Sequence, residues 1–491
     1  MRTSLFLILL TMTTGGKEYN QGKAKMEATG DTMSYLKPRV PDWHKNATIY
    51  EVNLRHFTPE GTFRAFEAHI PRLKEMGMDI LWFMPINPVS VKNRKGELGS
   101  PYAAADYYDT NPDFGTMDDF RHMMKAVQDA GMYVIIDWVP NHTGWDHTWI
   151  TEHPDWYTKD KDGNITDPIN AETGAPWGWT DVADLNYDNP EMRQGMIEAM
   201  AFWIRDVGID GFRVDVAHGV PVDFWEECSD ALYAIEPVFM LSEGEVPAIV
   251  NNGAFVMDYA WSMHSLLNKI AMTQGVNSKA HHLEKGNVVE GKTGEMEKKT
   301  ALDIDKALAK RDSLYHRGYQ MQFTSNHDEN AWAGTEFQRF GEGHLAFAVL
   351  VSTFDGMPLV YSGQESAVDM QYNFFKKDEI NWGDYQYAGF YKTLFDLKHR
   401  NKAIWNGEYG GKLVKIPTGT DENVYAFIRE KEGDKVVAII NLSGAKQKVT
   451  LEGASYKGGF TDIFSGEKME LNPGFTKEFL PWEYLLLANE E

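Results

Sequence analysis

An arginine and an aspartate two positions apart lie in the stretch of this sequence with the clearest potential for chemistry. Residues 211–216 alternate apolar side chains with Arg213 and Asp215, a period of two that predicts a short β-strand. On a strand both charged side chains face the same side, and a neighbouring guanidinium lowers the pKa of a carboxyl group. Asp215 would then be held ionised and in place, as a nucleophile must be. A structural ion pair at a strand end is the alternative interpretation.

Further acids and histidines follow other short apolar runs. Asp137 and His142 lie at the end of one run, Glu243 follows a second, and His327 and Asp328 follow a third. A single acid in such a position is usually a helix cap or an ion-pair partner. Several acids that converge on one place repel one another, and folding does not favour this arrangement unless it serves a function.

The elements that would bring these residues together are eight short apolar runs that alternate with helical patterns. Eight strand–helix alternations predict an α/β protein with a closed, parallel (β/α)8 TIM barrel. Reactive groups of such barrels lie at the carboxyl ends of the strands, so the acids and histidines would meet at one rim. The predicted strands are residues 49–54, 80–84, 133–139, 212–216, 238–241, 255–259, 319–324 and 359–361.

Helix signals support the same alternation. Helices are predicted over 63–76 and over 117–130, the second with Thr116 as its N-cap. A third follows Asn189, with Pro190 at the first helical position, where the missing N–H of proline costs nothing.

Two long intervals interrupt the barrel pattern. Residues 143–190 follow the third strand without sustained periodicity and are predicted to form a small inserted domain, so that the barrel comprises residues 41–142 and 191–404. Residues 262–315 have a helical pattern and are predicted to extend the sixth helix of the barrel.

The pattern changes again near the end of the chain. Residues 405–491 are predicted to form a C-terminal antiparallel β-sandwich. Within it, apolar runs at 424–428 and 436–442 flank Glu432-Gly433-Asp434, which is a hairpin signal. Because no low-complexity linker precedes this domain, we expect it to pack firmly on the barrel.

The start of the chain resembles a secretory signal peptide. Arg2 precedes an apolar run at 5–10, and small residues continue to Gly16, which is the usual order of charge, apolar core and small residues. The run is too short to span a bilayer. We therefore expect a signal peptide over residues 1–16, a polar arm over 17–40, and a secreted or periplasmic protein.

Charge and composition exclude several classes of partner. The 491 residues carry a net charge of −24, and an acidic surface repels phosphate backbones and anionic lipids, so we expect neither nucleic acid nor a membrane surface as a partner. Cys228 is the only cysteine, which excludes a disulfide within the chain and a thiolate zinc site. The 15 Trp, 22 Tyr and 26 Phe residues supply flat apolar rings of the kind found in sugar-binding clefts.

Two carboxyl groups with different pKa values at one rim meet the chemical requirement of glycoside hydrolysis. One group attacks or stabilises the sugar carbon, and the other protonates the leaving oxygen. The sequence contains no glycine-rich phosphate loop, no Cys–His pair and no histidine-rich metal cluster, each of which would indicate a different reaction.

These segments resemble a known family. In order and spacing they are similar to the four short signature segments of the α-amylase family, glycoside hydrolase family 13, and the resemblance extends from about residue 45 to the end of the chain. The signature segments are Asp137 to His142, Gly211 to Asp215, Glu243, and Asn326-His327-Asp328, and supporting matches are Tyr102 before Asp106-Tyr107, Ala183 to Asn186, Gly356-Met357-Pro358 and Gly363-Gln364-Glu365.

The resemblance implies roles for the acids. Asp215 would be the nucleophile and Glu243 the general acid/base, with Glu245 as the rival for the second role. Asp328 would bind hydroxyls of the cleaved sugar and strain its ring, and Asp137 would support the site from behind.

The resemblance also implies roles for residues that bind the same sugar. Arg213 would hold Asp215 ionised. His142 and His327 would donate to hydroxyl groups, unless they are simply packed histidines. Tyr102 would stack on the sugar ring, unless it is an ordinary core tyrosine.

A structural calcium ion is implied as well. In the family, side chains that match Asn141 and Asp184, together with a carbonyl that matches Gly219, hold calcium between the barrel and the inserted domain, and oxygen ligands suit this ion. The alternative is that Asn141 and Asp184 only hydrogen-bond across that junction.

One departure from the family pattern affects the leaving-group side. Many α-amylases have Lys-His where this chain has His218-Gly219, and that lysine reaches a sugar on the leaving-group side. His218 would take its place with a shorter side chain.

The sequence therefore predicts a retaining, endo-acting hydrolase of α-1,4-glucosidic bonds whose substrate is starch or another α-glucan. An exo-acting α-glucosidase, a cyclomaltodextrinase or neopullulanase, and an α-glucan transglycosylase are alternatives with the same chemistry. A non-catalytic glycan-binding homologue is an alternative of another class, and such a protein would be expected to have lost one of the three acids.

Overall fold

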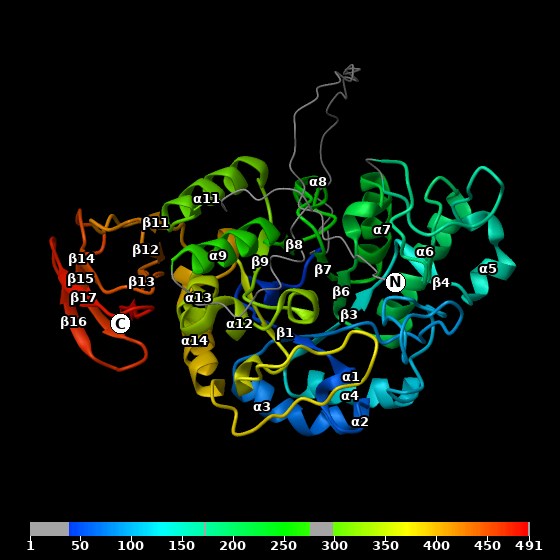
Figure 1. Cartoon of the computed structure of the whole chain (residues 1–491), viewed down its shortest axis with the longest axis horizontal. Helices are drawn as coiled ribbons and strands as arrows, with labels where there is room; N and C mark the ends of the chain where they lie inside the picture. Colours follow the sequence, from blue (N-terminus) through cyan, green and yellow to red (C-terminus); the bar gives the residue numbers. More distant parts are fainter. Residues whose placement is uncertain (1–38, 171–172, 275–297, 490–491) are drawn as a thin grey trace, which may run out of the picture.

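The computed structural model describes residues 39–170, 173–274 and 298–489. Figure 1 shows the barrel strands at the centre, the C-terminal strands in red at one end and the inserted segment with α5 in cyan at the other. The predicted signal peptide, most of the polar arm, and the middle of the predicted 262–315 extension lie outside the described residues.

Eight parallel strands close into a barrel in the order β1-β10-β9-β8-β7-β6-β3-β2. Each strand overlaps one of the predicted runs, so the predicted TIM barrel is confirmed. Apolar side chains such as Ile80, Ile135 and Leu241 fill the barrel interior, as a packed barrel core requires. The strands are β1 (Ile49–Val52), β2 (Ile80–Phe83), β3 (Tyr133–Trp138), β6 (Gly211–Val214), β7 (Phe239–Ser242), β8 (Met257–Tyr259), β9 (Tyr319–Gln322) and β10 (Met357–Tyr361).

Helices surround the barrel and begin where the sequence signals place them. The Thr116 side chain accepts from the Asp119 N–H, and the Asp119 carboxylate accepts in return from the Thr116 N–H, which is a capping box. The Asn189 side chain caps α6 in a similar way. The α-helices are α1 (Leu54–Phe57), α2 (Phe63–Phe66), α3 (Ile70–Glu75), α4 (Met117–Asp129), α5 (Thr148–Glu152), α6 (Pro190–Phe202), α7 (Val222–Ile235), α8 (Pro247–Asn251), α9 (Trp261–Thr273), α11 (Leu302–Leu314), α12 (Glu336–Phe340), α13 (His344–Thr353) and α14 (Ala388–Arg400).

The segment between β3 and α6 carries a small sheet of its own. Strand β4 (His142–Gly144) pairs antiparallel with β5 (Val182–Asp184). This pairing places His142 opposite Asp184, so the segment folds back to the mouth of the barrel.

The C-terminal region is an antiparallel sheet domain. A six-stranded sheet has the order β11-β12-β13-β18-β15-β16, and β14 pairs with β17 in a second sheet. The predicted hairpin is confirmed, because β12 and β13 pair antiparallel on either side of Glu432 and Gly433. The strands are β11 (Val414–Lys415), β12 (Val424–Lys431), β13 (Asp434–Asn441), β14 (Gln447–Thr450), β15 (Gly458–Asp462), β16 (Lys468–Leu471), β17 (Thr476–Phe479) and β18 (Tyr484–Ala488).

A buried arginine joins this domain to the barrel. The Arg429 guanidinium on β12 donates to the backbone oxygens of Thr353 at 3.0 Å and Phe354 at 2.7 Å, at the end of α13. These contacts agree with the expectation of firm packing. In the part of the chain that the structure describes, no helix has the length and apolar character needed to cross a membrane.

Candidate active site

Three carboxyl groups converge on one guanidinium at the carboxyl rim of the barrel. Arg213 Nη1 lies 2.8 Å from Asp137 Oδ1 and 2.9 Å from Asp215 Oδ1, and Nη2 lies 3.2 Å from Glu243 Oε1. The strand register explains part of this arrangement, because Asp137 on β3 is paired with Arg213 on β6. The structure therefore brings together acids that are far apart in the sequence.

Aromatic side chains hold the guanidinium in place. Its central carbon lies 5.1 Å from the ring centre of Trp82, 5.8 Å from that of Tyr102 and 5.5 Å from that of Tyr259. The Tyr259 hydroxyl also accepts from Arg213 Nε at 3.1 Å, and Trp82 Nε1 donates to Asp137. Sequence reasoning missed Trp82 and Tyr259, because an aromatic residue in an apolar strand carries no signal that separates it from the core.

Ionising all three carboxyl groups around one buried cation is electrostatically unfavourable, because three negative charges exceed the single positive charge. Burial raises the pKa of Asp137 to about 6, despite the opposing effect of Arg213. Burial and then Glu243 raise the pKa of Asp215 well above its usual range, whereas Arg213 lowers it. Arg213 thus lowers the pKa of Asp215 in the predicted direction, but burial and Glu243 outweigh it, and the prediction that Arg213 holds Asp215 ionised stays a prediction.

Glu243 and Glu245 lie in different environments. Glu243 Oε2 accepts from the Val216 N–H at 2.8 Å, which holds the carboxyl group beside Arg213. Glu245 instead accepts from the N–H of Ser262 at 2.9 Å and from its hydroxyl group, at the start of α9. Of the two glutamates, only Glu243 contacts Arg213 and its group of acids in the described part of the chain.

Val216 has an unusual backbone conformation directly after Asp215. Its φ of 45° and ψ of 38° lie in the left-handed region, which a β-branched residue rarely adopts. Such strain costs on the order of 1–3 kcal/mol and is concentrated at functional sites. Here the conformation directs the Val216 N–H to Glu243.

His327 and Asp328 follow β9 and face the same rim. His327 Nε2 lies 3.2 Å from Asp328 Oδ2 and 2.7 Å from the Tyr102 hydroxyl, and Nδ1 lies 2.5 Å from Glu51 Oε1. Sequence reasoning missed Glu51. An acid inside the otherwise apolar strand β1 is the signal that could have found it.

Tyr102 lies between two other rings. Its ring centre is 5.4 Å from that of His327 and 5.9 Å from that of Phe374, with interplanar angles of 20° and 14°. Its hydroxyl group donates to Asp137 Oδ2 at 3.0 Å. Phe374, which lies on the loop after β10, is therefore a site residue that sequence reasoning missed, and the stacking of Tyr102 on a sugar stays a prediction.

The two remaining histidines lie farther along the rim. Burial lowers the pKa of His142 to about 4, so its imidazole is neutral at pH 7. Its ring centre lies 5.9 Å from that of Trp179. His218 is exposed and lies next to Gly244, where a Cβ atom would come within 3.3 Å of His218 Nδ1. It thus flanks the loop that carries Glu243.

The predicted calcium ligands meet at the junction of barrel and inserted segment. A Cβ atom on Gly219 would come within 2.5 Å of Asn141 Oδ1, and the backbone oxygen of Asn141 accepts from the N–H of Leu185, next to Asp184. Burial raises the pKa of Asp184 to about 7, and the ion pairs of the described residues give it no cation. A partly buried carboxylate beside amide and carbonyl oxygens fits calcium.

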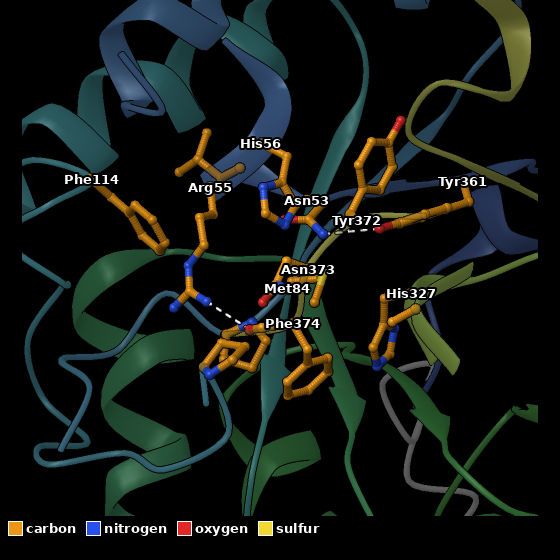
Figure 2. Close-up of a pocket in the computed structure, with 14 residues that line it drawn as sticks. Asn53, Arg55, His56, Met84, Phe114, His327, Tyr361, Tyr372, Asn373 and Phe374 are labelled. Atoms are coloured by element: carbon orange, nitrogen blue, oxygen red, sulfur yellow. Dashed lines mark hydrogen bonds between the residues drawn. The ribbon is translucent and has the colours of Figure 1, made fainter. Parts of the chain in front are cut away.

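A small pocket lies beside His327 (Figure 2). Its free space of about 20 Å³ holds one water molecule rather than a sugar. Arg55 Nη1 donates to the Phe374 backbone oxygen at 2.9 Å, and Asn53 Nδ2 donates to the Tyr361 hydroxyl at 2.9 Å. Arg55 therefore contacts the loop that carries Phe374, whereas Asn53 contacts the end of β10.

A TIM barrel with this acid cluster at its carboxyl rim is the arrangement of a glycoside-cleaving enzyme. The family profile described as "Alpha amylase, catalytic domain" matches residues 26–411. The chain belongs to the α-amylase family of glycoside hydrolases and transferases, and it is an enzyme of that family.

Individual proteins support this assignment. The chain is 27% identical to "Alpha-amylase MalA" of Haloarcula japonica over 445 residues, which are 87% of this chain and 59% of that protein. It is 26% identical to an oligo-1,6-glucosidase of Parageobacillus thermoglucosidasius over 380 residues, 66% of this chain and 65% of that protein. The chain thus spans less than two thirds of the length of both relatives.

A solved structure agrees over nearly the whole chain. The maltogenic α-amylase AmyB from Thermotoga neapolitana superposes with a TM-score of 0.74 at 25% identity, covering 90% of this chain and 98% of that one.

Proposed function

We propose that the protein hydrolyses α-1,4-glucosidic bonds in starch or maltodextrins with retention of configuration. The observation that carries this proposal is the convergence of Asp215 and Glu243 on Arg213. Two neighbouring carboxyl groups can supply both a nucleophile and an acid, which is what retaining hydrolysis requires.

The proposed reaction has two steps. In the first, Asp215 attacks the anomeric carbon while Glu243 protonates the glycosidic oxygen, which leaves with the departing chain. In the second, Glu243 takes a proton from water, and the water oxygen displaces Asp215 from the sugar. Arg213 balances the negative charge that moves between the two carboxyl groups.

Four other residues would line the site of the cleaved sugar. Asp328 accepts from its hydroxyl groups and His142 approaches from β4, while His327, whose two ring nitrogens face Glu51, Asp328 and the Tyr102 hydroxyl, acts through Asp328. The edge of Tyr102 that Phe374 and His327 leave free would contact the ring face.

Aromatic side chains continue outward from the residues around the acid cluster, and an extended aromatic surface favours binding of a chain of several glucose units. Beyond Tyr102 and Phe374 lies Trp332, 5.4 Å from Phe374 between ring centres and 41% exposed. Beyond His142 lies Trp179, which stacks on Trp177 at 5.7 Å. These rings give glucose units beyond the cleaved one an apolar surface to bind.

The alternatives differ in outcome rather than in chemistry. The relative named oligo-1,6-glucosidase keeps an exo-acting glucosidase in consideration, and the shorter His218 favours weaker binding on the leaving-group side. Cyclomaltodextrinase, neopullulanase and transglycosylase activities use the same acids. A non-catalytic glycan-binding role is disfavoured by the presence of Asp215, Glu243 and Asp328 at one rim.

Starch hydrolysis tests both parts of the proposal. We expect early NMR spectra to show the α-anomeric proton of the released reducing end first, because two inversions at the anomeric carbon, the first by Asp215 and the second by water, restore the configuration. We also expect the iodine colour to fall before many reducing ends appear. A β-anomer as first product contradicts retention, and glucose as sole early product with lagging colour loss contradicts endo action.

We further propose a calcium ion held by Asn141, Asp184 and the Gly219 carbonyl. The ion would tie the inserted segment to the barrel and balance the charge of the partly buried Asp184 carboxylate. Removing a ligand that only the folded state binds lowers stability, so excess chelator should lower the melting temperature. Added calcium should restore it, and Asp184→Asn should melt at the lower temperature with or without calcium. An unchanged melting curve after verified metal removal contradicts the site.

We infer from the sequence that the protein is secreted or periplasmic. This proposal rests on the signal-peptide pattern of residues 1–16. We also propose the domain boundaries predicted from the sequence, with an inserted domain at 143–190 and a C-terminal domain at 405–491.

A further inference from the structure

Glu51 is a buried acid that no step of the proposed reaction uses. It lies on β1, in register with Trp82 of β2 and Tyr361 of β10, and its exposed fraction is 0%. A buried carboxylate is costly unless it is paired. Its Oε1 lies 2.5 Å from His327 Nδ1, whereas Oε2 has no hydrogen-bond partner among the described residues.

His327 has acceptors on both ring nitrogens. Nδ1 faces Glu51, and Nε2 faces Asp328 at 3.2 Å and the Tyr102 hydroxyl at 2.7 Å. An imidazole that donates from both nitrogens is a cation. The Tyr102 hydroxyl donates onward to Asp137, so it accepts from His327.

The charges on the two sides of His327 depend on each other. Burial by itself would lower the pKa of His327, but Asp328 and Glu51 together raise it well above its usual value. Burial likewise raises the pKa of Asp328, yet His327 outweighs this effect and the pKa lies below its usual value. Neutralising Glu51 would therefore weaken the cation that keeps Asp328 ionised.

We propose that Glu51 is a positioning residue for the reaction: its carboxylate holds His327 as a doubly hydrogen-bonded cation, and His327 in turn orients Asp328 as an acceptor for hydroxyls of the cleaved sugar. The link to the sugar rests on the proposed function, whereas the link from Glu51 to Asp328 rests on the contacts alone. The titratable and charged groups that face Glu51, His327 and Asp328 are Tyr102 from the loop after β2, Asp137 from β3, Arg213 from β6, Tyr259 from β8, Glu329 after β9 and Tyr361 from β10.

The decisive variant is Glu51→Gln, which keeps the size and an acceptor oxygen but removes the charge. NMR of histidine-labelled full-length protein, with the His327 signals assigned through their loss in His327→Gln, follows the proton directly. We expect His327 to stay protonated at pH 8 in the wild type and to lose its proton at least about one pH unit lower in Glu51→Gln, since an adjacent opposite charge shifts a pKa by this much or more.

Activity gives a second readout. We expect the basic limb of the kcat/KM profile of Glu51→Gln to move to lower pH by the same amount, with kcat at pH 8 at least about tenfold below wild type. A resonance that does not shift, or a loss of activity that is uniform across pH, overturns the proposal. The NMR result does not depend on the substrate. Failure of the proposed role of Glu51 is therefore distinguishable from failure of the proposed activity on starch.

A matched control comes from a second buried pair on the same loop. Glu329 Oε2 lies 3.0 Å from His264 Nε2, and Glu329→Gln should leave the titration of His327 and the basic limb in place. A shift as large in Glu329→Gln as in Glu51→Gln overturns the specific role of Glu51. If Glu51→Gln does not fold, Glu51→Asp is the alternative variant. Its side chain is one methylene shorter but keeps the negative charge, so His327 should stay protonated. A His327 that titrates near pH 6.5, the ordinary histidine value, in that variant also overturns the proposal.

Discussion

Replacement of Asp215 by Asn, or of Glu243 by Gln, should lower kcat on starch by several orders of magnitude, and by at least about 10²-fold in each case. Asn cannot form the covalent ester with the sugar, and Gln cannot protonate the leaving oxygen. Both substitutions keep the side-chain volume, so the surroundings of Arg213 change little in shape. The measurement is single-turnover and steady-state hydrolysis of a defined maltooligosaccharide.

Azide distinguishes the two roles. In Glu243→Ala, azide should attack the glycosyl-enzyme and release an α-glycosyl azide, because the sugar is still inverted twice. In Asp215→Ala, azide should replace the missing nucleophile and give the β-azide after one inversion. Glu245→Gln, which changes a carboxylate bound to Ser262, should stay close to the wild-type rate. The role assignment fails if either Asp215→Asn or Glu243→Gln keeps more than a tenth of that rate, or if the azide products are exchanged.

The barrel could be predicted because its signals are local. Eight apolar runs of strand length, Thr116 before α4 and Asn189 before α6 each act within a few residues of chain. The acids of the site could be predicted for a related reason. A charged side chain at the end of an apolar strand is conspicuous, and the barrel topology places all such ends at one rim.

The rest of the site depends on contacts across the barrel. Glu51 meets His327 from a strand 276 residues earlier in the sequence, and Trp82, Tyr259 and Phe374 are aromatic residues whose neighbours only the fold determines. The charge of Asp215 is another case. Arg213, two residues away, predicts a lowered pKa, but the fold adds burial and Glu243, and both raise it.

Loss of Arg213 should have the second large effect, on stability as well as on activity. Arg213→Met removes the only cation in direct contact with Asp137 and Asp215 among the described ion pairs. Breaking a buried ion pair by removing one partner costs about 3–5 kcal/mol, because the remaining charges stay buried. We expect a loss of unfolding free energy of this order at neutral pH, measured by urea denaturation. Arg205→Met is the control, since Arg205 pairs with Glu198 and Asp206 at 46% exposure and surface pairs contribute at most about 1 kcal/mol.

The pH dependence of this loss follows from the raised pKa values. Asp137 has a pKa of about 6 in the folded protein and about 3.9 when unfolded, so the folded state binds more protons between these values. The stability that this carboxyl contributes is complete below about pH 4 and is lost as the pH rises through about 6. Without Arg213 the pKa values of Asp137 and Asp215 rise further, and the loss continues to higher pH. The unfolding free energy of Arg213→Met should therefore be much closer to that of the wild type at pH 5 than at pH 8. An equal deficit at both values would mean that lost packing, rather than uncompensated charge, is what Arg213 prevents.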